Sequence, residues 1–420
     1  MIYKANIIDT PTKDAFRIIE NGYIHVNEQG IVEGVYASLP DKLSSEPIRD
    51  FGDRLLIPAF YDLHVHAPQY RNMGLAMDLP LLPWLQTYTF PEELKFSDLK
   101  YAERIYRRFV HELWMQGTMR SCVFATVHAP ATNLLMKLFN EAGLGAYVGL
   151  VAMNRNCPSQ LTNTIEELDH FYKQEGNDLV KPIVTPRFIP SCSRDMLKRL
   201  GEIAKQYNLP VQSHLSENRD EIRLVHRLLP EVLTYGDGYL KYGLFGQTPT
   251  LMAHCCHTRG RELRLLKKHS VMVVHRPTSN CNMGSGAAPV RRFMDKGIAV
   301  ALGSDVSGGH NASMLRVIQY TLQTSKLYQT FSLLREPALK VSEAFYLATK
   351  SGGSFFGHCG GFEAGSQFDA LVVDDSYLNA EKYTLDQRIE RYIFIGDDRD
   401  IKHRFCAGRE IAEPKLVVGD

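Results

Sequence analysis

Short apolar runs rich in β-branched residues recur between residues 55 and 305, and amphipathic stretches separate them. Eight such runs predict buried strands, at 55–66, 119–126, 146–153, 181–188, 210–214, 250–254, 270–275 and 298–305. The stretches between them predict helices. In one of these, Ala102, Ile105, Phe109 and Leu113 recur at helical spacing before Gly117. Alternation of strand and helix is typical of a parallel sheet, and eight strands can close a barrel, so we predict an α/β fold with a (β/α)₈ TIM-like barrel.

Both ends of the chain predict a second, smaller unit. The first 55 residues or so contain short apolar runs joined by turns, and a glycine-rich turn with a strand pattern follows the predicted helices at 312–328 and 341–349. Two strand-rich ends can pair with each other beside the barrel. We therefore predict a small β-sandwich domain built from 1–57 and 359–420, with the barrel domain at 58–358 between them.

The connection between His66 and the predicted helix near Leu99 is unusually long and contains four prolines. Long ordered loops in compact domains usually carry function, and loops that follow barrel strands lie at the catalytic face. We therefore predict that this segment covers the active site as a lid.

Composition narrows the class of protein. The 420 residues carry a formal net charge of only +1, which does not indicate a nucleic-acid surface. We see no signal peptide at the N-terminus and no apolar stretch approaching the ~18 residues of a membrane span. The eight cysteines are scattered without a C-x-x-C pair, which is typical of reduced thiols in a cytosolic enzyme. We expect a cytoplasmic protein that binds neither nucleic acid nor membrane.

Polar residues end several of the predicted strands. His64 and His66 end the first strand and point the same way, and His214, His254 and Asp305 end the fifth, sixth and eighth. A pair of histidines alone could be ordinary strand-end residues. However, a buried Asp305 is costly unless it is paired or bound to a cation, and the carboxyl ends of barrel strands share one face. Together these residues predict a site for a divalent metal, with Zn²⁺ favoured and Fe²⁺ as the alternative.

Glu217 follows His214 by three positions and can shuttle protons beside a metal. Its alternative role is that of an acidic residue at a helix N-terminus, and the two roles are compatible. Asp305 can bind the metal and also take a proton from the metal-bound water. Lys181 lies at the non-catalytic end of the fourth strand, so we expect one metal ion rather than two bridged by a modified lysine. The sequence lacks the H-x-E and P-C-x-x-C pattern of other zinc deaminases, and also the phosphate-binding glycine motifs.

At this point the residues resemble a known family. The run at 57–66, the strand-end residues above and the closing strand at 368–372 are similar to the amidohydrolase superfamily. A narrower set of blocks resembles its guanine deaminases, in register over nearly the whole chain: HAPQY (66–70), DLPLLPWL (78–85), YTFPEE (88–93), PRF (186–188), SCS (191–193), QSHLSEN (212–218) and DVSGG (305–309).

The resemblance implies hydrolysis of guanine to xanthine and ammonia by a metal-activated hydroxide, a purine base as the ligand, and a homodimer. It also implies roles for individual residues: metal ligands at His64, His66, His214 and Asp305, a contact with water and substrate at His254, a proton shuttle at Glu217, hydrogen bonds to the purine edge from Gln69 and Arg187, and packing on the ring by Trp84 and Phe188. We expect His214 to contact the substrate as well. By default the two aromatic residues would be core residues, and Arg187 would be a surface or ion-paired residue.

The sequence departs from the family pattern in two places. Ala59 follows Pro58 where glycine is usual, and Arg276 stands where cysteine is more frequent. We expect Arg276 to add a cation near the rim of the site, where it could alter substrate preference, and His310 receives no role. Two alternatives stay open: a sister enzyme that deaminates an adenine nucleoside, pterin or triazine, and a non-catalytic structural descendant. The second would have lost metal ligands that this chain keeps.

Overall fold

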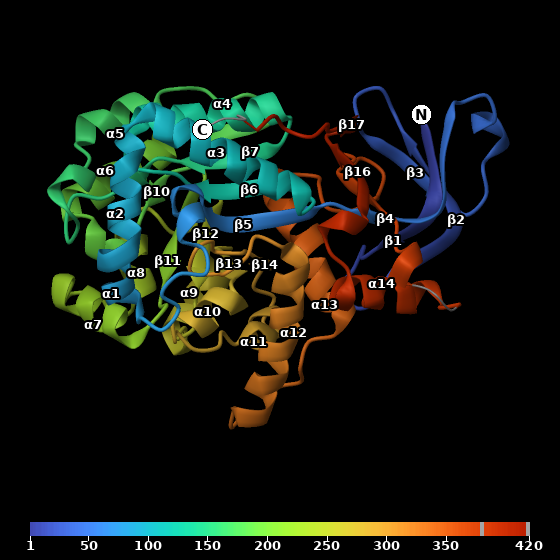
Figure 1. Ribbon diagram of the computed structural model, residues 1–420. Coiled ribbons are helices and arrows are strands. Elements are labelled where there is room, and N and C mark those ends of the chain that lie inside the picture. Colours follow the sequence, from blue (N-terminus) through green and yellow to red (C-terminus); the bar gives the residue numbers. More distant parts are fainter. Residues whose placement is uncertain (379–381, 417–420) are drawn as a thin grey trace.

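Two groups of parallel strands form the centre of the larger part of the molecule, on the left of Figure 1. The computed structural model describes residues 1–378 and 382–416. One sheet has the order β5 (Phe60–His66), β6 (Thr118–Phe124), β7 (Gly145–Gly149) and β9 (Val180–Pro182). The other has the order β11 (Val211–Leu215), β12 (Thr250–His254), β13 (Met272–His275) and β14 (Val300–Leu302). The short strands β8 (Val151–Ala152) and β10 (Thr185–Pro186) pair separately.

Hydrogen bonds connect the two parallel sheets at both sides. Val184 forms a parallel bridge with Val211. On the other side, the backbone N–H of Asp305 donates to the carbonyl of His64 at 2.8 Å, and that of His66 donates to Val306 at 3.0 Å. Neighbouring strands within each sheet follow the order of the chain and run parallel. The predicted α/β class with parallel strands is therefore confirmed.

Helices follow the strands and lie around them (Figure 1). They are α3 (Leu99–Met115), α4 (Ala129–Ala142), α5 (Ile165–Tyr172), α6 (Arg194–Gln206), α7 (Arg219–Leu228), α8 (Tyr235–Lys241), α9 (Gly260–Lys268), α10 (Pro277–Asn282), α11 (Val290–Asp295), α12 (Met314–Phe331) and α13 (Val341–Tyr346). Side-chain caps fix several starts. Asp98 accepts from the N–H of Lys100 at α3, and Asn218 and Glu221 form a capping box at α7. The α7 cap fixes the backbone next to Glu217.

Each predicted strand overlaps a strand of the structure, but three of the apolar runs divide. The run at 146–153 divides into β7 and β8, and the run at 181–188 divides into β9 and β10. The apolar run at 55–66 divides, because β4 (Ile48–Pro58) ends before Ala59 and β5 begins after it. Its first half belongs to the smaller part of the molecule. The lid segment, residues 67–98, is not an open loop: it contains α1 (Leu81–Trp84), a π-helical turn (Leu85–Thr89) and α2 (Phe90–Glu93).

Segments from both ends of the chain share one mixed sheet, on the right of Figure 1. Its order is β17 (Arg409–Glu410), β16 (Ile401–Cys406), β15 (Ala370–Val373), β4, β1 (Ile2–Asp9), β2 (Arg17–Val26) and β3 (Val32–Tyr36). Its side chains alternate between two cores. Ala370 and Val372 pack with the aromatic cluster of this sheet, whereas Leu371 and Val373 join the main core. The pairing of the two ends agrees with the expectation, while the two-layered sandwich stays a prediction.

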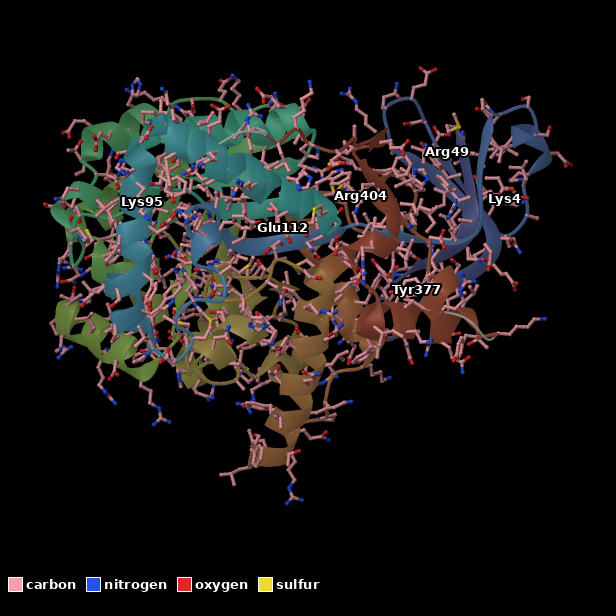
Figure 2. All side chains as sticks on the ribbon, viewed as in Figure 1. Lys4, Arg49, Lys95, Glu112, Tyr377 and Arg404 are labelled. Carbon is pink, nitrogen blue, oxygen red and sulfur yellow. The ribbon has the colours of Figure 1, made fainter. Side chains whose placement is uncertain are left out.

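Arg404 on β16 connects the two parts of the molecule (Figure 2). It donates to the carbonyls of Trp114 and Met115 at the end of α3, and its guanidinium lies 4.1 Å from the centre of the Trp114 ring. The C-terminal region is less strand-rich than predicted, because it also contains the helix α14 (Leu385–Ile395). Within the described ranges, no helix combines the length and apolar character needed to cross a membrane.

Candidate metal centre and active site

The register of the parallel strands brings the predicted site residues to one end of the sheets. His66 at the end of β5 pairs with Phe124 at the end of β6, and Leu215, next to His214, pairs with His254 at the end of β12. Asp305 follows β14 closely, and its backbone bonds to that of His64. Side chains that are far apart in the sequence therefore meet above the same strand ends.

The three predicted histidine ligands form a tight, buried cluster. One ring nitrogen from each of His64, His66 and His214 lies within 4.8 Å of the others. The Nε2 atoms of His64 and His66 are 3.0 Å apart, and each is 3.3 Å from Oδ1 of Asp305. Lone pairs of these atoms repel one another at such distances unless a proton or a cation lies among them, and three imidazoles with one carboxylate are a ligand set that a divalent metal accepts. The four residues therefore fit a divalent metal.

The protonation states of these ligands also suit a metal. Burial lowers the pKa of His64, His66 and His214, which keeps the imidazoles neutral. The Nδ1 atom of His214 lies 2.6 Å from the carbonyl oxygen of Arg187, which can only accept, so Nδ1 carries the proton and Nε2 offers its lone pair. Neutral imidazole is the form that binds metals.

Arg276 lies beside the predicted carboxylate ligand. Its side chain is 0% exposed, and Nη1 is 3.2 Å from Oδ2 of Asp305. Burial raises the pKa of Asp305, but the Arg276 charge and the contacts with His64 and His66 outweigh this effect and hold it well below its usual value. The expectation that Arg276 lies near the rim is wrong, because the residue follows β13 directly and turns inward.

Glu217 and His254 form a second pair next to the metal cluster. His254 Nε2 is 3.0 Å from Oε2 of Glu217, and the Ser285 hydroxyl donates to Oε1 at 2.9 Å. His254 Nδ1 lies 2.8 Å from Oδ1 of Asn280, a carbonyl oxygen that can only accept, so Nδ1 carries a proton. The pair can therefore hold and move a proton at Glu217 Oε2 and His254 Nε2.

A single pocket joins nearly all of the predicted site residues. The residues that line it include His66, Gln69, Trp84, Arg187, Phe188, His214, Glu217, His254 and Asp305. His64 is buried beneath them. Leu81, Trp84 and Leu85 come from the lid segment, so this segment borders the pocket as predicted. Trp84 and Phe188 give the pocket an aromatic surface, and the polar side chains around them can bond to the edge of a flat, neutral ring.

Trp84 and Arg187 also satisfy the default roles weighed for them. Trp84 belongs to an apolar cluster under the lid segment, and its Nε1 donates to the carbonyl of Leu75 at 3.3 Å. Arg187 is 3% exposed and forms an ion pair of 2.7 Å with Glu93. Both side chains are held by the fold and still border the pocket, so neither role excludes the other.

The structure adds residues that the sequence did not single out. The Phe124 ring centre lies 4.5 Å from that of His64, 4.6 Å from His66 and 5.0 Å from His214, so it forms an apolar wall of the metal cluster. Asn280 bonds to His254, and Glu93 bonds to Arg187. Phe124 could have been found from the sequence, because it ends a strand as the predicted ligands do. Asn280 and Glu93 could not, because they are 26 and 94 residues away from their partners.

His310 is not brought into the site. Its ring lies 3.1 Å from Asn282 Nδ2 and 3.5 Å from the Tyr320 hydroxyl, outside the group of residues that line the pocket.

Two of the site residues have unusual backbone conformations. His254 has φ of 68° and Asp305 has φ of 53°, in the left-handed region that non-glycine residues rarely adopt. Such strain is often found at functional sites, where it aims a side chain.

Comparison with known proteins agrees with this geometry. Residues 55–411 match the model of the amidohydrolase family. The chain is 34% identical to a guanine deaminase of Dictyostelium discoideum, with 98% of both chains covered. It is 33% identical to the human guanine deaminase, with 98% of this chain and 96% of that protein covered.

A solved structure is similar over the whole fold. The guanine deaminase of C. acetobutylicum, determined with guanine bound in its active site, is 48% identical and superposes with a TM-score of 0.96, covering 98% of this chain and 99% of that one. The matched family region includes the metal cluster, the Glu217–His254 pair and the pocket. The chain belongs to the amidohydrolase family.

Proposed function

We propose that this protein is a guanine deaminase, which converts guanine and water to xanthine and ammonia. The observation that carries the proposal is the single pocket in which a metal cluster, a proton-shuttling pair and two hydrogen-bonding residues meet. The relatives named above are guanine deaminases, and they cover nearly the whole chain. The reaction belongs to the breakdown or salvage of purines.

We infer one metal ion, held by His64, His66, His214 and Asp305. Three neutral imidazoles and one carboxylate favour Zn²⁺, and Fe²⁺ is the alternative. A bound metal of this kind lowers the pKa of water towards about 7, which supplies a nucleophile at neutral pH. This chain contributes to metal binding the negative charge of Asp305 and the lone pairs of three neutral imidazoles.

Glu217 is the proton shuttle in this proposal. The reaction forms a C–O bond and breaks the C–N bond to the exocyclic amine, so one proton must reach a ring nitrogen and another the leaving amine. Glu217 borders the pocket and has a carboxylate oxygen 3.0 Å from His254. We propose that His254 holds the water and substrate, that Asp305 can take the first proton, and that Glu217 delivers protons to the ring and the amine.

Gln69 and Arg187 recognise the edge of the ring, and Trp84 and Phe188 pack on its face. Guanine is neutral and planar, so stacking and directional hydrogen bonds suit it better than a charged clamp. All four side chains border the pocket. The competing function is deamination of another aminated ring, and it is supported by the same fold and metal cluster.

We further propose the larger organisation on the same grounds. The two parallel sheets, bonded at both sides, support a closed (β/α)₈ barrel at 58–358, with a small β-sandwich domain at 1–57 and 359–420. The family resemblance supports a homodimer. The eight cysteines, which form no disulfide within the described residues, support a cytoplasmic enzyme.

The test is to follow the ultraviolet spectrum and the release of ammonia with guanine, adenine, adenosine, a pterin and an aminotriazine. We expect guanine to react fastest and to give xanthine. If guanine is inert and another ring reacts, the roles of Gln69 and Arg187 are wrong, but the metal site stands. If the metal-loaded protein deaminates none of them, the reaction class is wrong.

A further inference from the structure

Glu93, the last residue of α2, connects two polar residues of the pocket. Its side chain is almost fully buried. Oε1 accepts a hydrogen bond from Gln69 Nε2 at 3.1 Å, and Oε2 accepts one from Arg187 Nη1 at 2.7 Å. Gln69 and Arg187 line the pocket, whereas Glu93 is not among the described residues that do so. The carboxylate therefore lies behind the two residues that would touch a ligand.

This carboxylate decides which way the Gln69 amide points. An amide can present either its oxygen or its NH₂ group, but an ionised carboxylate can only accept. With Nε2 bonded to Glu93, the amide turns its oxygen away from the carboxylate, and among the described residues only the Ser307 N–H approaches that oxygen, at 3.5 Å. Gln69 therefore presents an acceptor to the pocket.

The same carboxylate fixes Arg187. Its Nη1 is engaged by Glu93, and its guanidinium lies 5.3 Å from the centre of the Phe90 ring at the other end of α2. The remaining N–H groups of Arg187 are donors and cannot accept. One short helix of the lid segment thus orients an acceptor on Gln69 and donors on Arg187 in one pocket.

We propose that Glu93 is a positioning residue that makes the pocket selective for rings in which an N–H lies next to a carbonyl group. This inference rests on the proposed function and deepens it. In guanine, the ring N–H would face the Gln69 oxygen and the neighbouring carbonyl would face Arg187. The ring 2-aminopurine carries the same amine on the same carbon but lacks both the N–H and the carbonyl. Its turnover therefore measures the reaction without this recognition.

The experiment compares metal-loaded wild type with Glu93→Gln, which has nearly the same shape but can donate as well as accept. The readouts are kcat/KM for guanine and for 2-aminopurine, and the inhibition constant of 2-aminopurine against guanine. We expect the guanine to 2-aminopurine preference to fall at least about tenfold, because directional hydrogen bonds to a substrate carry strong discrimination. The loss should lie mainly in guanine, with 2-aminopurine changing less than about threefold.

Glu92→Gln is the matched control. Glu92 is the neighbouring carboxylate on the same helix and is also buried. It accepts from Lys95 Nζ at 2.7 Å and from the Tyr101 hydroxyl, and no contact joins it to Gln69 or Arg187 among the described residues. Lys95 belongs to the lid segment (Figure 2). We expect this variant to disturb the segment without changing the substrate preference.

Equal losses for both substrates in Glu93→Gln would overturn the proposal, because they would mean that Glu93 only holds the lid segment in place. If Glu93→Gln does not fold, Glu93→Asp keeps the charge on a shorter side chain and should also reduce the preference; an unchanged preference there counts against the proposal. Wild type that turns over 2-aminopurine but not guanine would overturn the proposed function itself. Wild type that prefers guanine, with a variant that prefers it equally, would overturn only the role of Glu93.

Discussion

His254 Nε2 lies 3.0 Å from Oε2 of Glu217, and both side chains are buried. The contact joins the end of β12 to the segment between β11 and α7. Asn280 holds the far nitrogen of the imidazole and Ser285 holds the other carboxylate oxygen. The pair is therefore fixed at both ends, which leaves the contact between them as the place where a proton can move.

Glu217→Gln should remove most of the activity and keep the metal. The amide has nearly the same shape but cannot carry a proton to the ring, and general acid–base groups contribute about 10²–10⁴-fold to rate. We expect kcat to fall by that order, with metal content measured on the same sample. Glu231→Gln, which changes an exposed carboxylate paired with Arg194 and Lys241, is the control. Near-normal turnover in Glu217→Gln would exclude the shuttle role.

Removal of the metal should lower both activity and stability. The cluster of His64, His66 and His214 leaves ring nitrogens facing one another when no cation is present. A ligand at about 100 times its dissociation constant stabilises the fold by about 2.7 kcal/mol. We therefore expect chelation to lower the melting temperature and abolish deamination, and added Zn²⁺ to restore both. A melting temperature that does not change when the chelator is added would count against a metal site here.

Arg276→Met should increase the affinity for the metal. One oxygen of Asp305 contacts the Arg276 guanidinium, and the other lies 3.3 Å from Nε2 of His64. Arg276 therefore competes with a metal ion for the charge of Asp305. Removing a buried cation at this distance should lower the metal dissociation constant on the order of tenfold. Competition with a coloured chelator measures this change.

The matched variant is Arg276→Lys, which keeps the charge and should change metal affinity much less. The metal-free form of Arg276→Met should also melt earlier than wild type, since Asp305 then lacks its partner. Equal metal affinities in the Met and Lys variants would show that the charge of Arg276 does not act on the metal.

Glu221 should make stability depend on pH. Burial, together with the nearby Glu217 charge, raises its pKa to about 8. Because this value lies above that of the unfolded chain, the stabilising contribution is complete below about pH 4.5 and is lost as the pH rises to about 8. Glu221→Gln resembles the protonated acid and can still bond to Tyr235. The free energy of unfolding, measured from pH 5 to pH 9, should fall less for the variant than for wild type; parallel curves would contradict the raised pKa.

Several of the site residues that we predicted from the sequence share one local feature, their position at the end of a strand pattern. His64, His66, His214, His254 and Asp305 all lie at or just beyond the ends of apolar runs, and runs of this kind form neighbouring parallel strands. Strand order and register then place their side chains together without further information. The α/β class followed from the same alternation, and the parallel sheets of the structure confirm it.

The sequence could not predict contacts that depend on how distant segments pack. Glu93 reaches Arg187 across 94 residues, and its neighbour Glu92 has the same chemistry but faces Lys95. Only the rotation of α2 distinguishes the two carboxylates. The position expected for Arg276 was wrong for a similar reason: an arginine after a strand is usually exposed, whereas this one is buried and contacts Asp305. The apolar run at 55–66 hid the break at Ala59, because both strands around it are buried.

That break has a consequence for the order in which the protein matures during synthesis. Only Ala59 separates β4 from β5, and β4 pairs with β15, where Pro58 lies opposite Ala370. A nascent chain that ends before residue 370 therefore has one edge of β4 unpaired, directly beside the strand that carries His64 and His66. Two of the proposed metal ligands, His64 and His66, precede in the chain the strands β15 and β16 that complete the sheet beside β5. Asp305 also follows them by more than 200 residues, so the proposed metal site should form only after most of the parallel strands have been synthesised.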